Sequence, residues 1–188
     1  MPAPAPKSKF RLSRSEWLVL LGVLLFLLSS LGPGWWAWHR HQRLGMVHVD
    51  LRVLDEAAQR FNREYGVWPG GGENAAKDRR FGRELSNAQV LNVLRAVEGP
   101  GNPQHRGNDQ QIVFIEVELH RPGWSGLDES GAFLDPWGTP YQMVFDSNFD
   151  NVCEVENSIY GRLIGQGLAL WSCGPDRRSD TPDDILAW

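Results

Sequence analysis

The sequence predicts an α+β fold in which a long N-terminal helix packs on a small antiparallel β-sheet. Three observations lead to this prediction. The chain opens with a basic tail and an apolar, uncharged run. A segment with helical periodicity follows directly, and short apolar or alternating segments separated by turn residues fill the second half. A long helix followed by several antiparallel strands is the element order of an α+β fold.

The composition limits the class of protein. The chain has 188 residues, of which 41% are hydrophobic and 11% aromatic, so most of it can bury a core. Its formal net charge of −4 argues against a general nucleic-acid binder, because such proteins carry a basic excess. The two cysteines are too few for a disulfide scaffold or a four-thiolate zinc site.

The first part of the chain predicts a membrane anchor. No charged residue occurs over residues 17–38, a run of 22 that would span about 33 Å as a helix, against roughly 30 Å for a hydrocarbon core. Four cations precede the run and two follow it, which favours a cytoplasmic N-terminus. We therefore expect a basic cytoplasmic tail over residues 1–15, a single-pass transmembrane anchor over residues 16–38 and a periplasmic globular domain over residues 39–188. A cleaved signal peptide is the alternative, but no clear small-x-small cleavage site follows the run.

An amphipathic helix is expected over residues 39–65. Apolar side chains recur there at spacings of three and four, at Val47, Leu51, Leu54, Ala58, Phe61 and Tyr65. Gly66 and Pro69 end it. One helix running from the membrane to Tyr65 is the simplest arrangement, with a bend or a melted turn at Pro33.

The rest of the chain predicts one short helix and several strands. Ser86 is the expected N-cap of the short helix, which ends before Gly99. Strands are expected over residues 112–119, 141–145, 152–155 and 168–171.

Four carboxylates near the C-terminus form a cluster of candidate metal ligands. They are Asp176, Asp180, Asp183 and Asp184, within nine residues. Carboxylates at this density repel one another unless they spread into solvent or a cation bridges them, and calcium takes six to eight oxygen ligands in flexible loops. A solvated acidic turn is the alternative.

The other chemically capable residues do not predict an enzyme. Cys153 and Cys173 lie in the strand-rich half, where they form either a disulfide in an exported domain or two buried free thiols. All five histidines precede residue 121, and the sequence has no nucleophile elbow, P-loop, dinucleotide fingerprint or His-Glu-x-x-His motif.

Three segments together resemble a known family. They are residues 61–69 (Phe-Asn-Arg-Glu-Tyr-Gly-Val-Trp-Pro), residues 134–142 (Leu-Asp-Pro-Trp-Gly-Thr-Pro-Tyr-Gln) and residues 171–185, which contain Trp-Ser-Cys-Gly-Pro-Asp and Thr-Pro-Asp-Asp-Ile. With the apolar N-terminal run, this combination resembles the G-type major pseudopilin of type II secretion systems, in the type IV pilin-like superfamily. The resemblance covers about residues 16–185. The family's processing motif, a glycine before a Phe-Thr-Leu-Ile-Glu-like run, is absent, and Arg-Leu-Ser-Arg-Ser-Glu stands at residues 11–16.

The resemblance implies a non-catalytic, pilin-like structural subunit anchored in the inner membrane. Its partners would be membrane lipid, other pilin-like subunits and the inner-membrane secretion machinery. Glu16 would serve assembly by neutralising a neighbouring subunit's N-terminal amine; its alternative is a place in the headgroup layer beside Arg14. The acidic loop would bind calcium structurally through Asp176 and Asp183, with Asp180 or Asp184 assisting.

Two other functions are weighed beside this one. The first is a membrane-anchored, calcium-stabilised periplasmic binding module that does not polymerise, which the missing processing motif favours. The second is an enzyme that uses the acidic loop as a metal site.

Overall fold

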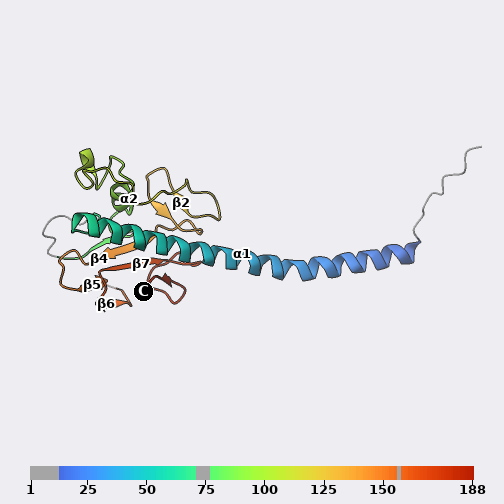
Figure 1. Cartoon of the computed structure of the whole chain (residues 1–188). Coiled ribbons are helices and arrows are strands. Elements are labelled where there is room, and N and C mark those ends of the chain that lie inside the picture. Colours follow the sequence, from blue (N-terminus) through green and yellow to red (C-terminus); the bar gives the residue numbers. More distant parts are fainter. Residues whose placement is uncertain (1–12, 71–76, 156–157) are drawn as a thin grey trace, which may run out of the picture. The chain divides into compact units, whose positions relative to one another are not determined.

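The computed structural model describes residues 13–70, 77–155 and 158–188, and within these ranges the side chains of residues 28 and 30–40 lie outside the description (Figure 1). The chain divides into two compact units, one ending at Gln42 and the other covering Arg43–Trp188. We describe each unit by itself.

The longest element is helix α1, Arg14–Tyr65, whose 52 residues belong partly to each unit (Figure 1). Its backbone stays helical through residues 32–34, so of the two alternatives predicted at Pro33 the melted turn is absent and the bend stays a prediction. A proline removes one helical hydrogen bond, and the bonds on either side of it keep the turn helical. α1 ends where predicted, at Gly66, which adopts a left-handed φ of 71° and donates its N–H to the Asn62 carbonyl.

The first unit contains the predicted anchor. In the part of the chain that the structure describes, no helix offers a stretch both long and apolar enough to span a bilayer. The predicted anchor, residues 16–38, includes residues 28 and 30–38, whose side chains lie outside that part. The described large apolar side chains over residues 17–27 are all exposed, by 48–71%.

The second unit is α+β, as predicted. Its elements after α1 are β1 (Arg79–Phe81), α2 (Ala88–Leu94), the 3-10 turn η1 (Pro103–His105), β2 (Gly126–Leu127), β3 (Phe133–Leu134), β4 (Gln142–Phe145), β5 (Val152–Val155), β6 (Gly161–Ile164), β7 (Leu168–Ser172) and β8 (Ile185–Leu186). Four strands form an antiparallel sheet in the order β1-β4-β7-β8, and β2–β3 and β5–β6 form separate pairs.

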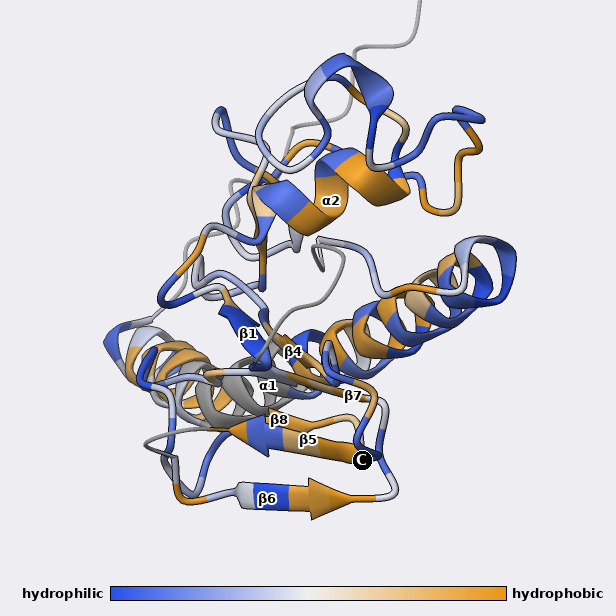
Figure 2. Ribbon diagram, turned by 90° about the vertical axis from the view of Figure 1, so that its left-hand side faces the viewer, coloured by the Kyte–Doolittle hydropathy of each residue, from blue (hydrophilic) through white to orange (hydrophobic). Residues whose placement is uncertain are grey.

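The four-stranded sheet is covered on both faces. On one face the predicted apolar stripe of α1, from Val47 to Phe61, packs in one core cluster with Met143, Phe145 and Leu170. On the other face Val144, Ala169 and Trp171 pack against the β5–β6 pair, which Figure 2 shows beneath the sheet. Because successive residues of a strand point to opposite faces, β4 and β7 supply both cores.

The strand predictions were only partly right. β4, β5 and β7 lie where expected, but residues 112–119 form no strand. The N–H groups of Phe114 and Ile115 both point to the Leu94 carbonyl, so most of this extended segment packs beside α2. Only its end pairs with a strand, through an isolated bridge between Leu119 and Leu127 of β2. β5 pairs with β6 and not with β4. The sequence did not predict β1, β2, β3, β6 or β8.

The short helix begins later than predicted. Ser86 accepts the Ala88 N–H through its Oγ at 3.2 Å, but Asn87 occupies the N-cap position. The fully buried Asn87 side chain donates to the Phe133 and Tyr141 carbonyls at 2.9 and 3.0 Å. It thereby fixes α2 to the segment between β3 and β4.

Candidate functional site

The loop between β7 and β8, residues 173–184, contains all four predicted metal ligands. Asp180 is held by two arginines, with Arg83 Nη1 at 3.2 Å and Arg80 Nη2 at 3.5 Å from its Oδ2. The Ser158 hydroxyl donates to its other oxygen. Asp180 therefore ties the loop to β1 and to the segment before β6.

Asp184 is also engaged by protein donors. Its Oδ2 accepts the Tyr160 hydroxyl at 2.6 Å and the Asp180 N–H at 2.8 Å. Burial raises the pKa of Asp184 above its ordinary value, although these hydrogen bonds act to lower it. Burial and the neighbouring carboxylate raise the pKa of Tyr160, so its hydroxyl stays a donor at neutral pH.

Asp176 and Asp183 lie at the more exposed part of the loop. Asp183 accepts the Asp176 N–H at 3.1 Å and the Thr181 hydroxyl at 2.8 Å, while Asp176 accepts the Arg178 N–H at 2.7 Å. Partial desolvation works against ionisation of Asp183, but these donors outweigh it and its pKa is lowered.

The predicted ligands share one loop without converging on a common point. Among the described residues, no group of three or more His, Cys, Asp or Glu side chains is arranged to hold a metal ion. Asp180 and Asp184 as they lie do not fit a calcium ion, because arginine, serine and tyrosine donors occupy their oxygens. Calcium binding stays a prediction.

The two cysteines are buried and unpaired in the structure. The Cys153 thiol donates to the Val144 carbonyl at 3.4 Å in the core beneath β4. Burial raises the pKa of Cys153 and of Cys173 to about 12, so neither forms a thiolate at neutral pH. The structure thus has the second of the two arrangements considered, and neither thiol is suited to nucleophilic catalysis.

Glu16, the predicted assembly residue, begins helix α1. Its Oε2 accepts the Ser13 N–H at 2.6 Å, and the Ser13 Oγ accepts the Glu16 N–H at 3.3 Å. This reciprocal pair is a capping box, which the Ser-x-x-Glu pattern of residues 13–16 encodes. This Ser-x-x-Glu signal is local and could have been found in the sequence.

The turn over residues 134–142 is pinned by a buried aspartate. Asp135 Oδ1 accepts the N–H groups of Trp137 and Thr139 at 2.9 Å, and Oδ2 accepts the Ser172 hydroxyl at 2.6 Å. Burial raises the pKa of Asp135, in opposition to these bonds. The second and third segments of the family resemblance are therefore joined directly to each other.

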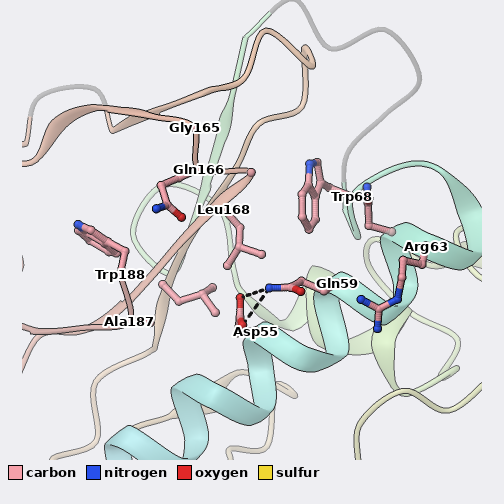
Figure 3. Close-up of a pocket in the computed structure, with 12 residues that line it drawn as sticks. Asp55, Gln59, Arg63, Trp68, Gly165, Gln166, Leu168, Ala187 and Trp188 are labelled. Carbon is pink, nitrogen blue, oxygen red and sulfur yellow. Dashed lines mark hydrogen bonds between the residues drawn. The ribbon is translucent and has the colours of Figure 1, made fainter.

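A pocket of about 380 Å³ lies between α1 and the edge of β7 (Figure 3). We call it the helix–sheet pocket. Figure 3 shows Trp188 at one side, Trp68 at another and the Asp55–Gln59 pair of α1 between them. Gln59 Nε2 donates to both Asp55 oxygens at 3.0 Å. Its described lining contains no histidine, cysteine or hydroxyl side chain, so it offers no nucleophile beside the carboxylate.

Comparison with known proteins finds no protein family, no curated protein and no solved structure that matches this chain. The family resemblance therefore rests on the three sequence segments and the apolar run alone.

Sequence reasoning missed a buried arginine beside the acidic loop. Arg80 is 6% exposed, and its guanidinium lies 5.0 Å from the ring centroid of Trp171. Its Nη2 donates to Ser179 Oγ at 2.8 Å, and Trp171 Nε1 donates to the same oxygen at 3.1 Å. No local pattern indicates this contact, because 99 residues separate Arg80 from Ser179.

Proposed function

We propose that this chain is a membrane-anchored, pseudopilin-like structural subunit of a type II secretion or type IV pilus-like assembly, without catalytic activity. The observation that carries the proposal is the continuity of α1. A single helix, Arg14–Tyr65, contains both the uncharged apolar segment and the stripe that packs on the sheet. Its predicted setting is the inner membrane, with a cytoplasmic N-terminus and a periplasmic domain.

The exposed apolar side chains of α1 need an apolar environment. Ten large hydrophobic residues over residues 17–27 are 48–71% exposed, on every side of the helix. Exposed apolar surface of this extent marks a membrane or protein contact in soluble and membrane proteins alike. Lipid would cover this segment in a single subunit, and the helices of neighbouring pilin-like subunits would cover it in an assembly.

The second unit supports the same proposal through its fold. The sheet-packing half of α1 and the antiparallel sheet form an α+β domain, which is the coarse architecture that the resemblance implies. The hydrogen bond from Ser172 to Asp135 joins two of the three resembling segments, so these two segments form one structural feature, which supports the proposal.

Membrane attachment is tested on the full-length chain by extraction of membranes with alkaline carbonate. We expect the protein to stay in the pellet, and Leu21→Glu with Leu24→Glu to release it. Val49→Glu with Val53→Glu is the matched control, because these side chains are exposed on the second unit's part of α1. Release of the unchanged protein by carbonate would contradict an integral anchor.

Assembly is tested separately by a photo-crosslinking side chain at Leu20 in native membranes. The proposal predicts crosslinks to further copies or to other pilin-like subunits. The same group at Val49, which lies outside the apolar segment, should not give these crosslinks. Intact mass of the extracted protein shows whether its N-terminus is Met1 or a processed residue near Leu12. Crosslinks to lipid alone would contradict assembly and leave the anchor unaffected.

A non-polymerising, membrane-anchored binding module is the second candidate. The observation that favours it is the engagement of Glu16 by the Ser13 N–H, which holds the carboxylate at its own helix start. This carboxylate is the group that would otherwise neutralise a neighbour's amine. A monomer in membranes at every expression level would favour the module.

Calcium is a separate part of the proposal, because it comes from the resemblance and not from the observed geometry. An ion would bind Asp176 and Asp183 only after the loop rearranged. Titration of the full-length protein in detergent should then release heat and raise Tm, and Asp183→Asn should abolish both, while Glu129→Gln in another loop should not. No heat and no rise in Tm would remove calcium and leave the structural-subunit proposal intact.

A further inference from the structure

A second pocket, of about 330 Å³, lies beside the β7–β8 loop and is lined by three arginines. We call it the arginine pocket. Its walls come from Gly82 and Arg83 after β1, from the Asp135 turn and the start of β4, and from the β7–β8 loop. Its lining residues are Gly82, Arg83, Thr139, Pro140, Gln142, Cys173, Arg177, Arg178 and Ser179. No carboxylate is among them, although the loop itself is acidic.

The arginines give the pocket a positive charge that the protein neutralises only in part. Arg83 shares Asp180 with Arg80. Arg177 and Arg178 are exposed, and no described carboxylate lies within ion-pair distance of either guanidinium. Guanidinium groups bind carboxylates and phosphates in a planar, two-point geometry. An anionic group is therefore the ligand that these side chains select.

Two hydroxyl groups in the pocket have protons to donate. Ser179 Oγ accepts N–H groups from Arg80 and Trp171, so both of its lone pairs are used while its proton has no acceptor in the described structure. The Thr139 hydroxyl forms no hydrogen bond with any described residue, although its backbone N–H is bound to Asp135. Both hydroxyls favour an oxygen anion.

One side chain of the pocket, Gln142, needs a hydrogen-bond donor and not an acceptor. Gln142 is 3% exposed, and its Nε2 donates to the Pro140 carbonyl at 2.9 Å. Its Oε1 is buried without any hydrogen-bond partner in the described structure. A buried carbonyl oxygen without a donor is unfavourable, so a ligand that brings an N–H or O–H group would satisfy it. The pocket thus matches an anion that carries a donor beside it.

We propose that the arginine pocket binds the free carboxyl terminus of a peptide. The terminal carboxylate would lie between Arg177, Arg178 and the two hydroxyls. The N–H of the terminal residue would donate to Gln142 Oε1 once the Gln142 side chain turns toward the pocket, because this oxygen is closed off as it lies. In a peptide this N–H is on the carbon next to the carboxylate, so one residue supplies both groups. Sulfate and fully ionised phosphate supply only acceptors, and they would leave Gln142 without a donor.

The test is calorimetric titration of the full-length protein in detergent with three short peptides. They are acetyl-Gly-Ala-Ala with a free carboxyl terminus, the same peptide with a terminal amide, and acetyl-Gly-Ala-Pro with a free carboxyl terminus. We expect the first to bind and the amide to show no binding, because it lacks the charge. The proline peptide should bind about tenfold more weakly, because its terminal residue has no N–H.

Two variants of equal charge change separate the pocket from general electrostatics. Arg177→Gln with Arg178→Gln should weaken binding at least tenfold, and since both side chains are exposed the fold should persist. Arg52→Gln with Arg106→Gln, also exposed but outside the pocket, should leave binding unchanged.

Equal affinity for the free acid and the amide would overturn the proposal. So would inorganic phosphate binding as tightly as the peptide, or no binding of any probe at millimolar concentration. These outcomes are independent of whether the chain is anchored or assembles.

Discussion

Arg80 shows at the scale of one residue how the acidic C-terminal loop is held. Its guanidinium stacks over Trp171, donates to Ser179 and lies 3.5 Å from Asp180, while the side chain is 6% exposed. A buried cation is tolerated only when it is paired and hydrogen-bonded, and removal of one partner leaves the other uncompensated. The loop therefore depends on an arginine far from it in sequence.

Replacement of this arginine should destabilise the protein strongly. Arg80→Met is expected to lower the free energy of unfolding by about 3 kcal/mol, because Asp180 then keeps only Arg83. Arg79→Met, at the exposed neighbouring position of β1, should cost less than about 0.5 kcal/mol. Urea unfolding of both variants, followed by tryptophan fluorescence, measures the difference. Equal losses would show that Arg80 does not hold the loop.

Asp50 predicts a pH dependence of stability that is also a property of one residue. It accepts the Tyr141 hydroxyl at 2.7 Å, and burial raises the pKa of Asp50 above its ordinary value. The folded state therefore retains this proton at a pH where the unfolded state has lost it. The contribution of Asp50 to stability is fully present below its unfolded pKa and is lost as the pH rises through its folded pKa.

Substitution of Asp50 isolates this effect from the other carboxylates. Asp50→Asn keeps an oxygen acceptor for Tyr141 and has no titrating proton. We expect the unfolding free energy of the unchanged protein, relative to Asp50→Asn, to increase as the pH falls from 7 to 4. Thermal melts across that range test it, and a constant difference would contradict the assignment.

At the scale of elements, the helix periodicity was predictable and much of the strand pairing was not. The spacing from Val47 to Phe61 identifies the buried face of α1 because a helix needs only its own sequence to bring these side chains together. A strand needs a partner, and residues 112–119 have the alternation of a strand but pair only at their end, where Leu119 forms an isolated bridge with Leu127. β1 and β8 are only three and two residues long, so they carry too little pattern to be recognised.

In the candidate sites, too, local features could be predicted from the sequence and contacts between distant segments could not. The clustering of the aspartates in one loop was visible in the sequence, since nine residues contain all four. Their partners were not visible, because Arg83 and Tyr160 come from elsewhere in the chain. The unpartnered carbonyl of Gln142 could not be predicted either, because it lies at a pocket formed by three separate segments of the chain.

The packing of α1 on the sheet can be tested with two adjacent residues of the helix. Leu54 is 2% exposed in the core, whereas Val53 is 41% exposed. Leu54→Ala should lower the free energy of unfolding by about 3 kcal/mol, and Val53→Ala by less than about 0.5 kcal/mol. Chemical unfolding measures both values. A larger loss at Val53 would place the wrong face of α1 against the sheet.

At the scale of the whole molecule, stability and attachment belong to different parts of the chain. Among the described residues, every hydrophobic side chain buried in the two cores is at Val47 or beyond it. The described apolar side chains over residues 17–27 are all exposed. The first unit therefore contributes surface that requires an apolar environment, and the second contributes the core that makes the fold stable.

This division predicts that residues 43–188 fold without the first unit. Expressed alone, this segment should be a monomer in water and unfold cooperatively, with a Tm within a few degrees of the full chain in detergent, because the buried apolar contacts are retained. The full chain without detergent should self-associate through its exposed apolar segment. Analytical ultracentrifugation and circular dichroism measure both properties. If residues 43–188 proved unfolded, or if the full chain stayed monomeric in water, the first unit would have to contribute to the core, and the proposed anchor would be wrong.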